Sequence, residues 1–479
     1  MWKLLLTVGC SCFCAIAVMS SDCLAIERRP NVIVVLIDDM GSADLSCFGG
    51  TVVKTPHLDR LAEEGLRFRS FYVNAPICSP SRVALTTGQY PHRWRITSYL
   101  DNRKANEQRG VAQWLDLKAP VLARELQRGG YATGHFGKWH MGGQRDVADA
   151  PLITEYGFEA SLTNFEGLGP RVLPLLDAFD GKPARKHDLG SATLGRGTIQ
   201  WAERSTITGE FVKSAVEFID RTQATATDGK AARPFYINVW PDDVHSPFFP
   251  SQVGRAGKNG NKRALYYEVL AEMDRQLGVL FESVRKDPAL RDNTLILVMS
   301  DNGHEDGAGS STPLRGGKTW LYEGGIRSPL IAWAPGMMAR DAVGEINADS
   351  IFCALDLNRS LYAVTQTLLP IGTTLDGEDL SATLLGHSSK SRSAPIFWRR
   401  PPDRPGTIEQ DNPDLGVRDG RWKFCMNYDG SEPQLFDLTA DVSESRNLVA
   451  EHPETAQRLR SLVDAWNSQL PTDAGSVKP

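Results

Sequence analysis

Four short apolar runs, each closed by polar residues, stand out in the hydrophobic pattern of the chain. They are NVIVVLI (31–37), YATGHFGKWH (131–140), PFYINVW (234–240) and NTLILVMS (293–300). Their length, their β-branched and aromatic residues and their continuous apolar character predict strands that are buried on both faces.

Stretches with helical periodicity separate these runs, at 57–65, 119–130 and 265–286. Alternation of strands and helices predicts an α/β fold with a large, mostly parallel sheet sandwiched by helices. Near the C-terminus, GRWKFCMNY and EPQLFDLTA predict a β-hairpin, and 453–470 predicts a closing helix. We therefore expect a small C-terminal α+β domain that carries an antiparallel sheet.

The N-terminus has the pattern of a signal peptide. Lys3 precedes an apolar run that ends in CLA at 23–25, a pattern that is typical of secretory leaders. The expected organisation is a signal peptide at 1–25, a catalytic domain at 26–390 and a C-terminal α+β subdomain at 391–479. No stable membrane span is expected in the rest of the chain.

The leader predicts an exported protein, which is either periplasmic or secreted. Attachment as a lipoprotein at Cys10 or Cys23 is the alternative. Once the leader is removed, the remaining cysteines are too few and too widely spaced for a disulfide framework. A net charge of −5 also argues against nucleic acid as a partner.

Hard oxygen ligands follow two of the predicted strands. Asp38 and Asp39 end the first run, and Asp301 and Asn302 follow the last. Ligands bind beyond the carboxyl ends of strands in parallel sheets, and oxygen-only sets suit calcium or magnesium. Turn chemistry is the alternative for such residues, but their repetition after buried strands favours a metal site.

The stretch CSPSRVALTTG predicts a short helix that starts near Cys78, with Ser79 or Ser81 as its cap. Cys78 would then lie at the positive end of this helix, with Arg82 on the same face. Lys138 and His140 are two residues apart on or beside a strand, so we expect them to point the same way. The Gly- and Pro-rich stretch 161–205 is expected to form long loops around a binding site.

Several blocks in this chain resemble one known family. They are NVIVVLIDDMG, TPHLDRLAEEG, CSPSRVALTTGQYPHR, GYATGHFGKWHMG, SDNGHE, GGKTWLYEGGIRSPLIAWAPG and LFDLTADVSESRNL. In order and content they are similar to the formylglycine-dependent (type I) sulfatases of the alkaline phosphatase superfamily, in the arylsulfatase and N-acetylgalactosamine-6-sulfatase branch. One departure is Val244, where the family often has proline before the residue that matches His245.

The resemblance implies a mechanism and its cofactors. In this family the motif cysteine is oxidised to formylglycine by a separate sulfatase-maturing enzyme, and the hydrated aldehyde, bound to calcium, attacks sulfur. The implied calcium ligands are Asp38, Asp39, Asp301, Asn302 and the modified Cys78. The implied catalytic residues are Cys78, Arg82, Lys138, His140, His245 and Lys318.

The expected function is therefore that of a sulfatase, a sulfuric ester hydrolase that releases sulfate from a sulfated saccharide. Two alternatives stay open. The first is a phosphate- or phosphonate-ester hydrolase of the same superfamily. The second is a non-catalytic glycan-binding protein on the same fold.

Overall fold

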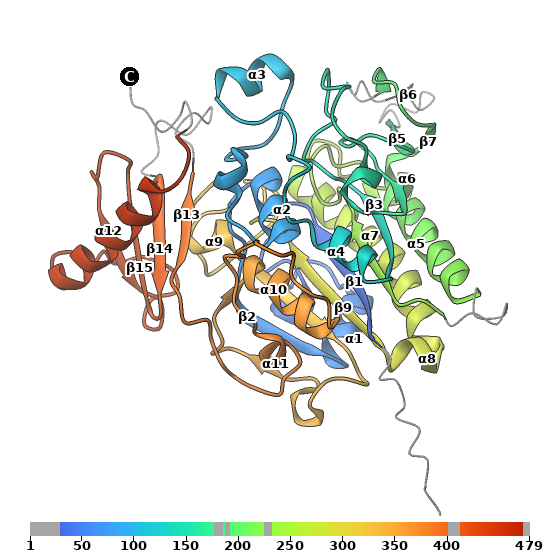
Figure 1. Cartoon of the computed structure of the whole chain (residues 1–479). Helices are drawn as coiled ribbons and strands as arrows, with labels where there is room; N and C mark the ends of the chain where they lie inside the picture. The colour runs from blue at the N-terminus through green and yellow to red at the C-terminus, as the bar shows by residue number, and fades with distance from the viewer. Residues whose placement is uncertain (1–28, 177–184, 187–191, 225–231, 401–411, 473–479) are drawn as a thin grey trace, which may run out of the picture.

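A nine-stranded sheet forms the centre of the molecule (Figure 1). The computed structural model describes residues 29–176, 185–186, 192–224, 232–400 and 412–472, so the predicted signal peptide lies outside the described residues. The strands follow in the order β11 (Ile346–Asn347), β2 (Leu66–Tyr72), β10 (Arg327–Trp333), β9 (Thr294–Ser300), β1 (Asn31–Ile37), β8 (Phe235–Trp240), β3 (Ala132–Gly137) and β4 (Ala160–Leu162), and β12 (Phe352–Cys353) also pairs with β2.

The sheet is mostly parallel, as the sequence predicts. β10 is the exception, because it runs antiparallel to both β9 and β2. All seven residues of β1 are buried, since β1 lies between β8 and β9 and helices cover both faces of the sheet. Burying one Val, Leu or Ile side chain contributes about 1.5–3 kcal/mol, so this central strand is strongly held.

Two groups of helices cover the sheet. Ile33 and Val35 of β1 share one core with α1 (Pro56–Glu63), α5 (Ile207–Ala224) and α7 (Lys262–Lys286). The alternate residues of β1 share a second core with α2 (Cys78–Thr87), α4 (Leu122–Arg128) and α10 (Ala354–Val364). The shorter helices are α3 (Arg103–Gln108), α6 (Gln252–Arg255), α8 (Pro288–Arg291), α9 (Glu323–Ile326) and α11 (Ser381–Leu384).

The predicted C-terminal antiparallel sheet is present. It has the order β13 (Ile396–Arg399), β14 (Leu415–Asp419), β15 (Trp422–Met426) and β16 (Gln434–Asp437), and α12 (Pro453–Ser468) packs against it. Together with the mostly parallel sheet and its helices, this confirms the predicted fold class.

A buried ion cluster joins this C-terminal sheet to the central one. Lys423 of β15 lies 3.1 Å from Glu323 of α9 and 2.7 Å from Glu444. The backbone N–H of Glu323 also donates to Glu444 (2.7 Å). The three side chains are fully buried, and Arg327 and Arg418 also lie 3.4 and 3.9 Å from Glu323, so opposite charges within the cluster offset the cost of burial.

The stretch 161–205 differs from the expected long loops. It contains β5 (Arg171–Leu176) and β7 (Ile199–Glu203), which pair in parallel, and the short β6 (Arg185–Lys186) beside β5. Pro174 interrupts the apolar pattern of β5, and β7 is largely open to solvent, which is why the sequence shows no clear strand signal there.

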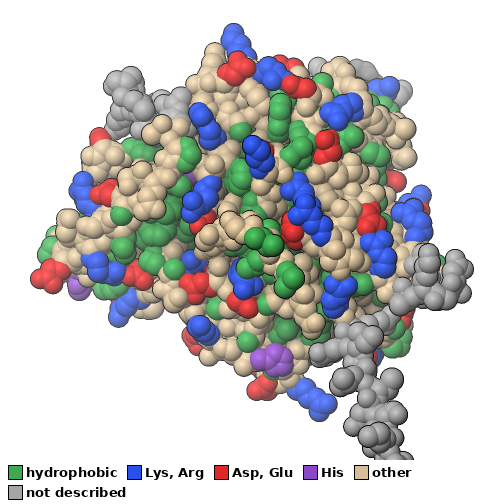
Figure 2. Space-filling view, in the orientation of Figure 1, with side chains coloured by type: hydrophobic (Ala, Val, Ile, Leu, Met, Phe, Trp, Pro, Cys, Tyr) green, Lys and Arg blue, Asp and Glu red, His purple; other side chains and the backbone are tan. Residues whose placement is uncertain are grey.

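The surface in Figure 2 carries basic side chains scattered among acidic ones, and no continuous basic area covers the face in view. Among the described residues, none of the helices combines the length and apolar character needed to span a bilayer.

Candidate active site

The carboxyl ends of β1 and β9 bring four predicted ligands together. The two strands are parallel neighbours, with Ile37 opposite Ser300, so the residues that follow them leave the sheet side by side. Asp39 N donates to Asp301 Oδ1 (3.2 Å), and Asn302 Nδ2 donates to Asp39 Oδ1 (2.7 Å). The strand register therefore builds the oxygen-rich cluster.

Cys78 completes this cluster from the start of α2. Its sulfur and one carboxylate oxygen each of Asp38 and Asp301 all lie within 4.8 Å of one another, and all three residues are buried. The residue that precedes the helix is Ile77, without a side-chain cap. The expected serine cap is therefore wrong, because Ser79 Oγ instead accepts from Leu100 N (3.0 Å).

The donor set fits a hard cation. Asp38 Oδ1 and Asn302 Oδ1 are buried and accept no hydrogen bond from the residues that the structure describes. Buried oxygens of this kind are unfavourable without a partner, and a calcium ion would satisfy them. The sulfur of Cys78 is a soft ligand, so the unmodified residue suits calcium less well than the neighbouring oxygens do.

Three cations match the three carboxylates in number. Arg82 Nη2 lies 2.8 Å from Asp301 and 3.4 Å from Asp38, Lys138 Nζ lies 2.7 Å from Asp38, and Lys318 Nζ lies 2.5 Å from Asp39. Their charges would be costly to bury singly, and pairing offsets that cost.

The same neighbours give the buried carboxylates different pKa values. Burial favours the protonated form of each, but the charges of Lys138 and Arg82 hold the pKa of Asp38 well below its usual value. Burial and the negative charge of Asp38 raise the pKa of Asp301 to about 7. Burial also raises the pKa of the Cys78 thiol to about 12, although Lys138 and Lys318 oppose the shift. The unmodified thiol is thus a poor nucleophile at neutral pH.

Two histidines lie near these charges. His245 is partly exposed (28%), with Nε2 3.5 Å from Asp39 Oδ2, and its Nδ1 donates to the carbonyl oxygen of Ser246 (2.6 Å). Burial and Lys318 lower the pKa of His245. A neutral imidazole at the site entrance is able to exchange a proton with a bound substrate.

His140 is buried and does not owe its position to strand alternation with Lys138. β3 ends at Gly137, which adopts φ +131, and His140 itself has φ +53. The strand therefore ends before Lys138 and His140, and strand alternation does not set the directions of their side chains. His140 Nε2 lies 2.7 Å from Glu166 Oε2, a residue that the sequence did not single out.

A small hollow of about 30 Å³ gives access to this cluster. It is lined by Asp38, Lys138, Phe165, Pro174, Arg204, Asp242, His245, Ser246 and Pro247. Phe165, Pro174 and Arg204 come from the stretch expected to surround the site. Arg204 was not predicted individually; it pairs with Asp243 (2.6 Å) and Asp242 (3.3 Å), and no motif marks it in the sequence.

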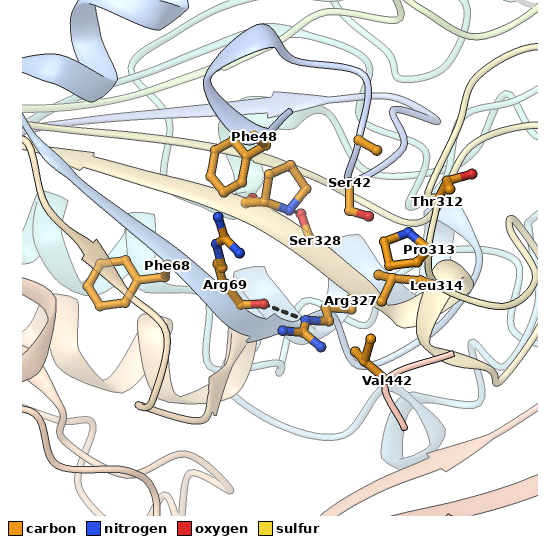
Figure 3. Close-up of a pocket in the computed structure, with 12 residues that line it drawn as sticks. Ser42, Phe48, Phe68, Arg69, Thr312, Pro313, Leu314, Arg327, Ser328 and Val442 are labelled. Atoms are coloured by element: carbon orange, nitrogen blue, oxygen red, sulfur yellow. Dashed lines mark hydrogen bonds between the residues drawn. The ribbon is translucent and has the colours of Figure 1, made fainter. Parts of the chain in front are cut away.

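A larger hollow, of about 170 Å³, lies elsewhere over β2 and β10 (Figure 3). Arg69 and Phe48 line it, and Arg327 donates to the carbonyl oxygen of Arg69. None of the predicted catalytic residues is among those that line it. Size alone therefore does not identify the reactive site, whereas the buried charge cluster does.

Comparison with known proteins agrees with this chemistry. The family model described as Sulfatase matches residues 30–355. Human arylsulfatase A is 31% identical over 474 residues, which covers 92% of this chain and 88% of that protein. The N-acetylgalactosamine-6-O-sulfatase of Bacteroides thetaiotaomicron is 27% identical, with 92% and 93% covered.

Solved structures show the same similarity in three dimensions. The crystal structure of Ps i-CgsB in complex with k-i-k-neocarrahexaose aligns with a TM-score of 0.72 at 25% identity, covering 92% of this chain and 93% of that one. A structure from work on the metabolism of multiple glycosaminoglycans by Bacteroides thetaiotaomicron aligns with a TM-score of 0.71 at 25% identity, covering 92% and 100%.

Proposed function

The chain belongs to the sulfatase family and is an arylsulfatase-like hydrolase of sulfate esters, and from this premise we propose that it releases sulfate from a sulfated carbohydrate. We propose further that it uses formylglycine made from Cys78 and a bound calcium ion. The observation that carries the proposal is the meeting of Cys78 with the oxygens of Asp38 and Asp301, within 4.8 Å, beside the buried Lys138 and the half-buried Lys318.

The proposed groups at the reaction centre have distinct roles. Formylglycine would supply a hydroxyl group of its hydrated aldehyde as the nucleophile for covalent catalysis, and calcium, held by Asp38, Asp39, Asp301, Asn302 and residue 78, would supply a Lewis acid beside it. Arg82 holds two of these carboxylates in place, because its guanidinium contacts both Asp38 and Asp301.

Lys138 and Lys318 are placed to bind sulfate oxygens. Each ammonium group has three N–H donors, and its contact with Asp38 or Asp39 uses one of them. The remaining donors would orient the ester and stabilise negative charge as the sulfur–oxygen bond breaks. Both lysines lie in water-poor surroundings, where such interactions are strongest.

His245 is the residue proposed to protonate the leaving alcohol, from its imidazolium form, in which Nδ1–H stays on the carbonyl oxygen of Ser246 and Nε2 carries the proton that is transferred. It lines the hollow that leads to the charge cluster, and an alkoxide would need a proton as it departs. His140, on the buried side, is proposed to take up the proton that the residue-78 group gives away. The two histidines would thus divide the proton transfers of the reaction.

Support for a carbohydrate comes from the similar proteins. One relative is named for N-acetylgalactosamine-6-O-sulfate chemistry, and one similar structure holds a neocarrahexaose. Asp242 and Arg204 also line the hollow beside His245, and a polar lining of this kind suits a sugar hydroxyl.

We also propose that the chain is exported by the leader at 1–25, as a periplasmic or secreted protein. Sequencing the N-terminus of protein recovered from cell fractions tests this. A first residue near 26 outside the cytoplasm is expected, and an intact N-terminus in the cytoplasmic fraction would contradict it.

The mass of the proteolytic peptide that carries residue 78 tests the mechanism. The protein is produced with and without a sulfatase-maturing enzyme, and an aldehyde in place of the thiol is expected only with it. Sulfate release is then measured on a panel of sulfated mono- and oligosaccharides, with 4-nitrophenyl sulfate and 4-nitrophenyl phosphate as controls. Aldehyde-containing protein that releases phosphate but no sulfate would overturn the proposed function.

A further inference from the structure

Glu166 is a buried acidic residue without an assigned role. Its side chain is fully buried, and its Oε2 lies 2.7 Å from His140 Nε2. Neither of its carboxylate oxygens accepts a regular hydrogen bond from the described residues. A buried carboxylate is kept only where neighbouring groups offset its charge. The charges of Glu166 and Lys138 act on each other, and His140 is the side chain in contact with Glu166.

The neighbours of His140 determine which ring nitrogen carries the proton. Nε2 is in hydrogen-bond geometry with the carbonyl oxygen of Leu100 (3.2 Å), and Glu166 Oε2 lies 2.7 Å from the same nitrogen without the angle of a regular hydrogen bond. A carbonyl and a carboxylate only accept hydrogen bonds, so Nε2 carries the hydrogen. Nδ1 is buried and has no hydrogen-bond partner among the described residues, which leaves its lone pair available.

The backbone ties Glu166 to the segment that carries His140. Trp139 N donates to Glu166 O (3.2 Å), so the loop that holds Glu166 and the turn after β3 are joined next to the histidine. Burial lowers the pKa of His140, and the charge of Glu166 opposes that shift. Lys138 and Arg82 also act on this ring and disfavour its protonation.

We propose that Glu166 is a positioning residue for His140: it keeps the hydrogen on Nε2, fixes the ring, and leaves Nδ1 as the base that serves the reaction. This inference rests on the proposed function, in which His140 accepts a proton from the group at residue 78. When Nδ1 takes up that proton, the imidazolium forms beside the Glu166 carboxylate. Nδ1 then gives this proton to water before the next turnover.

Glu166 is not expected to touch the substrate. Its neighbour Phe165 lines the hollow that leads to the site, whereas Glu166 is absent from that lining and fully buried. Loss of its charge should therefore lower kcat and leave KM nearly unchanged. A substrate-binding role would raise KM instead.

The kinetic test is a double-mutant cycle on protein matured with the maturing enzyme, with 4-methylumbelliferyl sulfate as the probe. Glu166→Gln is expected to lower kcat on the order of 10–100-fold, the effect typical of groups that orient a histidine. In a His140→Ala background the same change should alter kcat less than about twofold, because the two residues act as one unit. A full further loss in that background would overturn the proposal.

Two controls separate positioning from folding and maturation. Glu166→Asp keeps the charge and should retain more activity than Glu166→Gln; it also replaces Glu166→Gln in the cycle if that variant fails to fold. Asp274→Asn removes another buried carboxylate, one that accepts from the backbone of His57 and Leu58, and should leave kcat unchanged. For each variant, kcat is normalised to the aldehyde content at residue 78.

A second readout needs no turnover. Proton–nitrogen spectra of the histidine rings, recorded on protein with unmodified Cys78 and assigned with His140→Gln, report the tautomer directly. Wild-type protein should show the hydrogen of His140 on Nε2, and Glu166→Gln should shift both ring nitrogen signals. A hydrogen on Nδ1, or signals unmoved by Glu166→Gln, would overturn the inference. Absence of sulfate release in wild-type protein would contradict the proposed function, and these spectra would still decide the role of Glu166.

Discussion

Calcium should stabilise the folded chain by an amount that depends on Asn302. The perturbation is removal of calcium by a chelator, followed by its return. Asp38 Oδ1 and Asn302 Oδ1 accept no hydrogen bond from the described residues, and three buried carboxylates surround them. An ion held there binds the folded state and not the unfolded chain, which lacks the arrangement.

The magnitude follows from linkage. At a free calcium concentration about 1,000 times Kd, binding to the folded state contributes about 4.1 kcal/mol. A chain of 479 residues has an unfolding entropy of about 1 kcal/mol/K, from about 2.1 cal/mol/K per residue. Calcium should therefore raise Tm by about 4 °C.

Asn302→Ala provides the matched variant, because it removes a neutral ligand and no charge. Weakening of binding by about 30-fold, which is about 2 kcal/mol, would halve the effect of calcium to about 2 °C. Differential scanning calorimetry with chelator and with calcium measures both shifts. An unchanged Tm in wild-type protein, or equal shifts in the two proteins, would refute the reasoning about this oxygen cluster.

Three further predictions concern other parts of the chain. Cys78→Ala should abolish sulfate release and change Tm by no more than about 2 °C; a variant that still releases sulfate at the wild-type rate would exclude the mechanism. Lys423→Met removes the cation that contacts both Glu323 and Glu444 and should cost about 3–5 kcal/mol, a fall of about 3–5 °C in Tm by calorimetry; a change below about 1 °C would contradict it. Burial lowers the pKa of His92 to about 3. Below pH 6.5 the unfolded chain therefore binds a proton at this residue that the folded chain does not bind, and the free energy of unfolding falls by up to about 1.4 kcal/mol per pH unit. His92→Gln should remove this part of the loss in urea midpoints between pH 6.5 and 4.5, and an equal pH slope in both proteins would show that His92 does not cause it.

The sequence predicts the meeting of the acidic side chains that follow β1 and β9 well because local pattern and sheet topology act together there. Buried strands with continuous apolar residues are easy to recognise, and parallel neighbours bring their ends to the same edge. Asp38 and Asp301 therefore meet once β1 and β9 pair, although 262 positions separate Asp39 from Asp301. No other information is needed to place these oxygens together.

The contact between Glu166 and His140 could not be predicted from the sequence pattern. This contact depends on a loop that crosses from β4 to β5 and on the turn after β3, and neither has a periodic pattern. The strands β5 and β7 were missed for a related reason. Val172 of β5 packs against the core around α5, so burial in the folded chain, and not local alternation, stabilises that strand.

The burial of α2 limits the time during which Cys78 can be modified. All ten residues of α2 are buried, and Cys78 is only 2% exposed, so another enzyme has no access to this thiol once the helix has docked. Oxidation of Cys78 and folding would therefore compete, and a chain that folds first would keep its unmodified thiol. A substitution that speeds folding should lower the fraction of aldehyde even if it raises Tm. The yield of active enzyme would therefore depend on the relative rates of oxidation and folding in the newly made chain, and not only on its final structure.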